Sequence, residues 1–280
     1  MNHNTKRKYV KIGLYILQIV TSIIFIIPLL WMVEASFKPE NKIFQDVGTF
    51  KGFSLTNFTL LNYHEMLVRI PFMGYIFNSF IYIFFIIVIG ITVNSLAGYA
   101  LAKLDFPGSK IVLSVIIGLY IIPFETVLLP LYLITNKLGL INHYSALSMP
   151  FIAECFNIFL FRQFFMGFPK ELEEAAEIDG ASPLKTFLKI VLPNSKPVIA
   201  TSAVLTIVAH WGDFMWPLMV TTDDSLRTVQ VGIALFFTDP PIHYGAIMAA
   251  LTFTTLPIII VFLFLQKYYV QGIVSSGLKG

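Results

Sequence analysis

The sequence predicts an all-α integral membrane protein with six transmembrane helices. Of its 280 residues, 56% are hydrophobic and only 12% are charged, and the mean hydropathy is +0.78. A soluble core cannot enclose so much apolar surface. The apolar residues also gather into six long runs separated by polar segments, and about 20 apolar residues suffice to cross the hydrocarbon core of a bilayer.

Charge and cysteine content exclude several classes of protein. The net charge is only +3, without the clustered basic face that nucleic-acid binding needs, so we expect no nucleic-acid partner. The single cysteine, Cys155, excludes an intrachain disulfide and a cysteine-based metal cluster. We expect no metal site, and we expect Cys155 to have a packing role.

The first apolar run, residues 12–33, follows a basic N-terminus, residues 1–11, which carries four of the lysines and arginines. A secretory signal peptide would have a shorter apolar region and a small-residue cleavage site. We therefore expect an uncleaved first helix with its N-terminus in the cytoplasm. Residues 34–73 are polar and irregular, which predicts a folded external loop.

The remaining runs follow in order at about residues 74–102, 111–134, 144–165, 198–220 and 245–265. The loop between the second and third runs carries Lys103 and Lys110, so we expect it to be cytoplasmic. Pro123 and Pro130 interrupt the third run and predict a kink. The transmembrane domain thus covers residues 12–267, and residues 268–280 form a cytoplasmic tail.

The distribution of lysine and arginine supports this topology, because these residues accumulate in short cytoplasmic segments. Of the 19 in the chain, 13 fall in segments that the topology places inside. The six expected outside are Lys38, Lys42, Lys51, Arg69, Lys137 and Arg227.

The polar segment between the fourth and fifth apolar runs, residues 167–197, is predicted to form two short helices joined by a tight turn. Pro169 suits the start of the first helix, and Gly180 can end it in a left-handed conformation. Ser182 can cap a second helix that begins at Pro183 and ends before Pro193. Acidic residues favour the positive end of the first helix, and they are Glu171, Glu173 and Glu174.

This segment resembles the EAA loop of ABC-importer permeases, the cytoplasmic arm that docks on an ATPase subunit in that family. The matching residues are Glu174, Ala175, Ala176, Asp179, Gly180, Ala181, Phe187, Ile190, Leu192, Pro193 and Pro197. The resemblance implies the ABC type I importer permease architecture. It also implies ATPase-coupling roles, which we expect for Glu174, Ala175, Ala176, Asp179, Gly180, Ala181 and Pro193.

Other segments resemble the permeases of the maltose and multiple-sugar type. They include Ser36–Pro39, Ala97–Ala102, Phe106–Gly108, Leu160–Phe165, Trp211–Leu218 and the C-terminal tail. The resemblance implies the shorter permease of a heterodimeric sugar importer in the bacterial inner membrane, with both termini cytoplasmic. Its implied partners are a second permease, two ATP-binding subunits that the tail also contacts, an external sugar-binding protein and the lipid bilayer.

The chain itself lacks a P-loop, because Gly180 to Thr186 matches only the end of that motif and has no second glycine before Lys185. We therefore expect no enzyme activity and no cofactor in this chain, with ATP and Mg bound by the partner ATPase. The alternatives are a permease for a polyol, a glycerol phosphate or a peptide, and a secondary transporter driven by an ion gradient. A secondary transporter usually shows internal repeats, and an intramembrane enzyme would need a paired nucleophile and base.

Several polar or aromatic residues inside the predicted spans could line the substrate path. A charge at the bilayer centre costs roughly 2.5–3.5 kcal/mol, so such residues need partners or water. The candidates for hydrogen bonding or stacking with a sugar are Glu125, Glu154, Asn157, Trp211 and Asp213. The alternative for the polar residues is pairing between helices, and for the tryptophan a place at the membrane interface.

Overall fold

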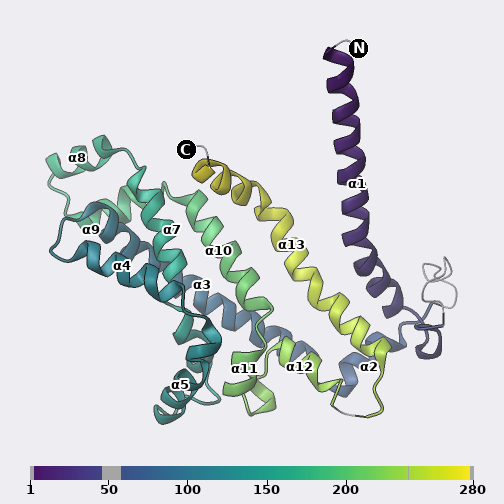
Figure 1. Ribbon diagram of the computed structural model, residues 1–280. Coiled ribbons are helices and arrows are strands. Elements are labelled where there is room, and N and C mark those ends of the chain that lie inside the picture. Colours follow the sequence, from purple (N-terminus) through teal and green to yellow (C-terminus); the bar gives the residue numbers. More distant parts are fainter. Residues whose placement is uncertain (1–2, 46–57, 239, 278–280) are drawn as a thin grey trace. The chain divides into compact units, whose positions relative to one another are not determined.

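The computed structural model describes residues 3–45, 58–238 and 240–277, and every regular element in these ranges is helical. The middle of the predicted external loop, residues 46–57, and the last three residues of the predicted tail lie outside them. The chain forms two compact units (Figure 1). One consists of residues 1–72 and 233–256, and the other of residues 73–232 and 257–280.

The first unit joins the end of the first helix to the polar segment that follows it. Its elements are α1 (His3–Ser36), η1 (Glu40–Lys42), α2 (Leu61–Arg69) and the first part of α13 (Tyr244–Gly277). The buried Asn62 donates to the carbonyls of Ser36 and Lys38 at 2.9 and 2.7 Å. The ammonium of Lys38 is also paired with Glu34 at 2.5 Å. These bonds satisfy the carbonyls at the C-terminus of α1 and fix α2 against it.

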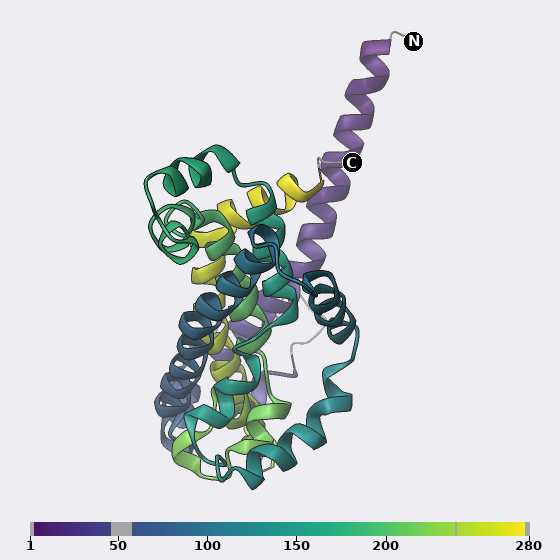
Figure 2. The same ribbon diagram turned by 90° about the vertical axis from the view of Figure 1, so that its left-hand side faces the viewer.

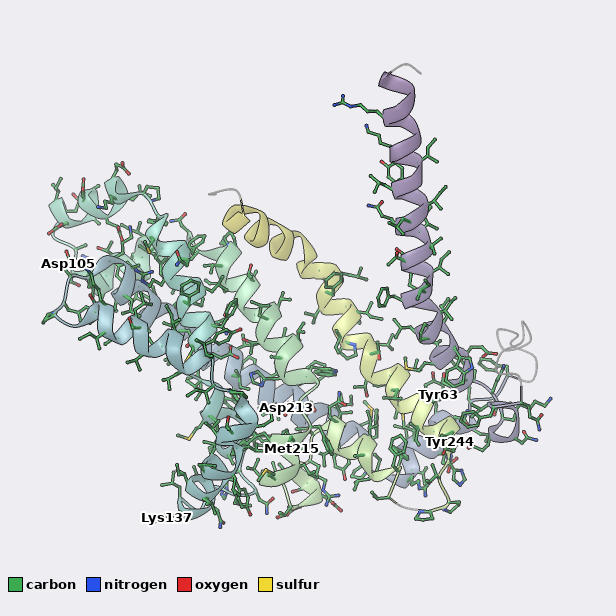
Figure 3. All side chains as sticks on the ribbon, viewed as in Figure 1. Tyr63, Asp105, Lys137, Asp213, Met215 and Tyr244 are labelled. Carbon is green, nitrogen blue, oxygen red and sulfur yellow. The ribbon has the colours of Figure 1, made fainter. Side chains whose placement is uncertain are left out.

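The start of α13 is held by a carboxylate from the same unit. Glu40 accepts hydrogen bonds from the backbone N–H groups of Tyr244 at 2.8 Å and Gly245 at 2.7 Å. The N–H groups of a first helical turn lack partners within the helix, and the helix dipole favours a negative charge there. Figure 3 marks Tyr63 and Tyr244 at the end of the unit where α1, α2 and α13 meet. The described part of the predicted external loop is therefore folded.

The second unit packs its helices around α7. α7 lies against α4 and α10, and α11 lies against α5 and α6. Its elements are α3 (Phe72–Lys103), α4 (Ser109–Tyr120), α5 (Phe124–Lys137), α6 (Tyr144–Ser148), η3 (Met149–Phe151), α7 (Cys155–Met166), α8 (Lys170–Ile178), α9 (Pro183–Thr186), η4 (Phe187–Val191), α10 (Lys196–Trp211), α11 (Met215–Val220), η5 (Asp224–Leu226), most of α12 (Val229–Leu235) and the rest of α13. Within this unit, α8 and α9 lie at one end and α5 and α11 at the other (Figure 1).

Three helices are long and apolar enough to cross a membrane, and they are Lys11–Ser36, Phe72–Lys103 and Tyr244–Phe264. Three bent pairs of helices pass the same test. If each bent pair forms one span, the chain has up to six spans. The pair α4 and α5 is bent by 101° at Pro123, where the sequence predicts a kink (Figure 2). None of the most apolar window of the first span is buried within the chain, so lipid or another subunit must cover it.

Three elements differ from the prediction. The fourth apolar run is bent by 47° at a break between η3 and α7. The fifth apolar run is broken between α10 and α11, from Gly212 to Phe214, because a turn follows Trp211. The last helix does not end near residue 267, after which we expected the tail to begin, but continues to Gly277. Residues 258–276 contain no proline that would stop it.

Candidate functional site

The polar segment 167–197 folds into a helix–turn–helix, which we call the arm. Pro169 precedes the first residue of α8, and Gly180 has φ +75°, the left-handed conformation that the tight turn requires. The hydroxyl of Ser182 accepts a hydrogen bond from the N–H of Lys185 at 3.4 Å and so caps α9. The local structure predicted for this segment is therefore confirmed.

The second helix of the arm packs on an aromatic core of the second unit. After α9 the backbone passes into the π-helical segment η4, which ends at Val191, before Pro193. Phe187 is buried, and its ring centroid lies 5.0 Å from that of Tyr99 on α3 and 6.1 Å from that of Phe165 on α7. The arm is therefore continuous with the core rather than a loop on its surface.

The first helix of the arm is attached to α3 through Lys103. The ammonium group of Lys103 lies 2.6 Å from the carboxylate of Glu173 and donates to the carbonyl of Phe168 at 3.0 Å. Both ionic side chains are mostly buried, with exposed fractions of 10% and 17%. One lysine thus holds both the entry to the arm and its first helical turn.

The opposite side of the arm is exposed and mixes acidic with apolar side chains. Ile178 is 85% exposed and Leu184 is 57% exposed. The predicted coupling residues Glu174, Ala175, Asp179, Gly180 and Pro193 are exposed, whereas Ala181 is half-buried and Ala176 is buried. Exposed apolar side chains on a rigid turn are typical of a surface that binds another protein.

A second group of functional candidates lies in the interior of the second unit, which we call the polar cluster. Figure 3 marks Asp213 to the right of both Asp105 and Lys137, which lie at opposite ends of that unit. The hydroxyl of Tyr82 on α3 donates to the carboxylate of Asp213 at 3.2 Å and lies 3.2 Å from Nδ1 of His210. The cluster thus joins α3 to the break between α10 and α11.

The break before α7 supplies the other half of the polar cluster. Glu154 precedes α7, and its backbone N–H donates to Asn94 at 3.0 Å. Its carboxylate accepts a hydrogen bond from Asn157 and lies 3.8 Å from Nε2 of His210. The amide of Asn157 also donates to Thr206 on α10 at 3.3 Å. The cluster therefore ties α7 to α10 as well.

The proton positions in the cluster follow from its donors and acceptors. Tyr82 has one proton, and an ionised Asp213 can only accept it. The contact between Tyr82 and His210 is then a hydrogen bond only if Nδ1 of the imidazole carries a proton and donates it to the hydroxyl oxygen. The other ring nitrogen, Nε2, faces Glu154. Within the described part of the chain, Nε2 of His210 and the buried Oδ1 of Asn157 have no hydrogen-bond partner. Both atoms are buried, so a further polar group could reach them only after the surrounding helices move.

Of the five residues predicted to line a path, the structure brings together Glu154, Asn157 and Asp213. Trp211 is 2% exposed and packs against the ring of Phe80 at 5.0 Å. Its indole is covered, so it cannot stack on a sugar in this conformation. Glu125 lies exposed in the first turn of α5 and is not part of the cluster.

Sequence reasoning missed three residues of these sites, Tyr82, Lys103 as an anchor, and Glu173 as its partner. Tyrosine is common in apolar spans, and a lysine at the end of a span reads as a topology signal. Their partners are distant in sequence, so no local pattern reveals them. Among the described residues, no group of three or more metal-ligating side chains occurs.

Comparisons with known proteins show the family of the chain. The model of the family described as "binding-protein-dependent transport system inner membrane component" matches residues 94–275. The arabinooligosaccharides transport system permease protein of Halalkalibacterium halodurans is 34% identical over 258 residues, which cover 92% of each chain. The trehalose/maltose transport system permease protein of Thermococcus litoralis is 36% identical over 277 residues, which cover 96% of this chain and 97% of the relative.

A relative with a different named substrate is the sn-glycerol-3-phosphate transport system permease protein of Yersinia enterocolitica, 36% identical over 74% of each chain. The fold matches a chain in the crystal structure of a bacterial ABC transporter involved in the import of the acidic polysaccharide alginate. That match has a TM-score of 0.80 at 20% identity and covers 96% of this chain and 99% of the other. The fold is thus that of an ABC type I importer permease, and the chain belongs to the family of inner membrane components of binding-protein-dependent transport systems.

Proposed function

We propose that this chain is one permease subunit of an ATP-driven carbohydrate importer, which transmits the closure of its ATPase partners to the membrane domain through the arm. The observation that carries the proposal is the two-sided construction of the arm. One side, including Phe187 and Glu173, is buried against the second unit, and the other exposes Glu174 and Ile178. A lever needs both a fixed side and a free docking side.

The lack of a P-loop indicates which partners the subunit needs. Because no P-loop occurs in the sequence, the nucleotide and Mg²⁺ belong to two ATP-binding subunits, which dock on the arm and on the C-terminal tail. A second, homologous permease completes the path, and an external binding protein delivers the sugar. The asymmetry of lysine and arginine supports a cytoplasmic position for the arm and both termini in the bacterial inner membrane.

In the proposed mechanism, closure of the ATP-binding subunits moves the arms and changes the side on which the path is open. Gly180 is central to this motion, because its left-handed conformation makes the tight turn that packs α8 against α9. Bistable helix packing converts such rigid-body shifts into alternating access. Catalysis itself takes place in the partner subunits.

A carbohydrate is favoured over a phosphorylated substrate by the charges in the polar cluster. The two carboxylates of Glu154 and Asp213 would repel a phosphate. Arg162, the only arginine in the predicted spans, donates from Nε to the carbonyl of Leu101 at 3.3 Å and so bridges α7 and α3. Sugar hydroxyls, in contrast, can both donate to carboxylates and accept from amides.

The proposed substrate contacts of this subunit are Glu154 and Asn157. The side chain of Glu154 is 31% exposed, so part of its carboxylate is accessible beside the bonds that it already makes. Oδ1 of Asn157 and Nε2 of His210 lie next to it without hydrogen-bond partners, and because both atoms are buried, the proposal requires them to become accessible when the helices move during transport. Asp213 has a positioning role in this proposal, since its carboxylate is engaged by Tyr82.

The test measures ATP-driven uptake of a labelled malto- or arabino-oligosaccharide by the complete complex reconstituted in proteoliposomes. Ile178→Asp places a charge in the apolar docking surface, and Gly180→Pro forbids the positive φ at the turn. Both variants should still assemble the membrane domain, while sugar uptake falls at least about tenfold and ATP hydrolysis no longer responds to the binding protein.

The matched control is Leu138→Asp. Leu138 follows α5 and is 65% exposed, so it introduces the same charge at an apolar surface away from the arm. Uptake should stay at the level of the unmodified chain. Normal uptake by both arm variants would contradict the proposal. Competition by glycerol 3-phosphate, but not by unlabelled oligosaccharide, would contradict the carbohydrate assignment.

A further inference from the structure

The arm is joined to the rest of the second unit by one charged contact as well as by apolar packing. Lys103 is the last residue of α3, and Glu173 lies in the first turn of α8. Their side chains meet at 2.6 Å, and the same ammonium group donates to the carbonyl of Phe168, one residue before Pro169. Lys103 therefore contacts the arm at two points on either side of its first proline.

The surroundings of this pair make the loss of one partner more costly than in an ordinary surface ion pair. Exposed ion pairs contribute little, because water screens them and the long side chains lose entropy. Lys103 and Glu173 are mostly buried, and the ring of Phe168 lies 5.9 Å from the ammonium nitrogen. Removing one partner of such a pair leaves the other charge buried and uncompensated. The contact is therefore specific to one position of α8 relative to α3.

The apolar attachment of the arm involves its other helix. Phe187 and Val191 pack with Tyr99, Phe161 and Phe165. An additional close approach holds α3 to α7, since a Cβ on Gly98 would lie 2.7 Å from the Cβ of Phe161. These contacts fix η4, α3 and α7. The helix α8 is attached through its packing against α9 and its buried Ala176, and Lys103 adds a charged contact from α8 to the end of α3.

We propose that Lys103 is the positioning residue that makes α8 move with α3, so that force applied to the arm reaches the membrane helices instead of bending the arm. This inference rests on the proposed function of the arm. It adds that the transmission of force depends on a charged anchor outside the segment 167–197. The ion pair is then required for coupling, whether or not it is required for folding.

The test separates coupling from stability in the reconstituted importer. Lys103→Met keeps the length of the side chain but leaves Glu173 unpaired, so uptake per ATP hydrolysed should fall about fivefold or more, and the melting temperature should fall as well. The double variant Lys103→Met with Glu173→Gln removes both charges, which should restore the melting temperature but not the coupling. Lys103→Arg should keep most of the coupling, and the exposed Lys110→Ala is the control that changes neither.

Restored coupling in the double variant would show that the pair only stabilises the fold, and it would overturn the proposal. A second measurement covers the case in which Lys103→Met does not assemble. Spin labels at Asp105→Cys and Lys170→Cys, in a Cys155→Ser background, report the distance between the end of α3 and the start of α8. With Lys103 intact, this distance should be the same without nucleotide and with bound ATP, and a shift between the two states would also overturn the proposal.

The outcome can be distinguished from a failure of the proposed function. If Ile178→Asp and Gly180→Pro uncouple transport while Lys103→Met does not, the arm transmits force but Lys103 is not its anchor. If none of these variants changes coupling, the arm has no such role and the proposed function fails.

Discussion

The hydroxyl of Tyr82 and Nδ1 of His210 lie 3.2 Å apart in the interior of the second unit. The same hydroxyl donates to Asp213 at 3.2 Å, and His210 faces Glu154 with its other nitrogen. A single phenol thus connects an imidazole with a carboxylate at the point where α10 ends. Because the surroundings of such a network have low polarity, each hydrogen bond that is not made costs free energy of folding.

Replacing Tyr82 by phenylalanine should therefore destabilise the protein without changing its shape. The variant removes one oxygen, which leaves the half-buried Asp213 and the buried His210 with one unmade bond each. We expect a loss of about 1–3 kcal/mol in the free energy of unfolding of the detergent-solubilised chain. Tyr120→Phe is the control, because Tyr120 is 62% exposed on α4. Equal stability of the two variants would show that the network contributes nothing.

Two helical glycines should respond in opposite directions to substitution by alanine. At Gly98 the added Cβ would lie 2.7 Å from the Cβ of Phe161 and 2.9 Å from the backbone nitrogen of Arg162. α3 and α7 would have to separate, at a cost of about 1–3 kcal/mol. At Gly118 nothing lies within 4 Å of the added Cβ, so alanine should stabilise α4 by about 0.5–1 kcal/mol. Unfolding titrations of both variants check this, and a destabilised Gly118→Ala would contradict the assigned environment.

The carboxylate of Glu40 is predicted to stabilise the start of α13. Glu40→Ala removes two acceptors from the N–H groups of Tyr244 and Gly245, which should cost about 1–2 kcal/mol, the range of a helix cap. Amide hydrogen exchange at residues 244 and 245 should become faster in this variant. Asn41→Ala, at the exposed neighbouring position, should leave the exchange unchanged. Unaltered exchange in Glu40→Ala would show that the cap is not formed.

The parts of the fold that could be predicted from sequence depend on local chemistry. Pro123 ends α4, Gly180 takes a positive φ and Ser182 caps α9, because each effect is a property of the residue and its immediate neighbours. The apolar runs likewise predicted the long helices, since length and hydropathy are enough for that.

The parts that could not be predicted depend on contacts between distant segments. The break at Gly212 has no proline within it, and the last helix passes the expected boundary after Lys267 because no proline there would stop it. Trp211 could not be placed either, since its indole is covered by Phe80 from another helix. The partners Tyr82 and His210 are 128 residues apart, so only the folded chain shows that they belong to one cluster.

The central claim, that the exposed side of the arm docks on an ATP-binding subunit, can be tested most directly by site-specific crosslinking. In a Cys155→Ser background, Ile178→Cys carries a short bifunctional crosslinker in the assembled importer, and Leu138→Cys serves as the control. Ile178→Cys should yield an adduct whose second component is the P-loop subunit identified by mass spectrometry, and Leu138→Cys should yield none. An ATP-binding subunit that co-purifies with the complex but forms no adduct with Ile178→Cys, or one that reacts only with Leu138→Cys, would contradict the account.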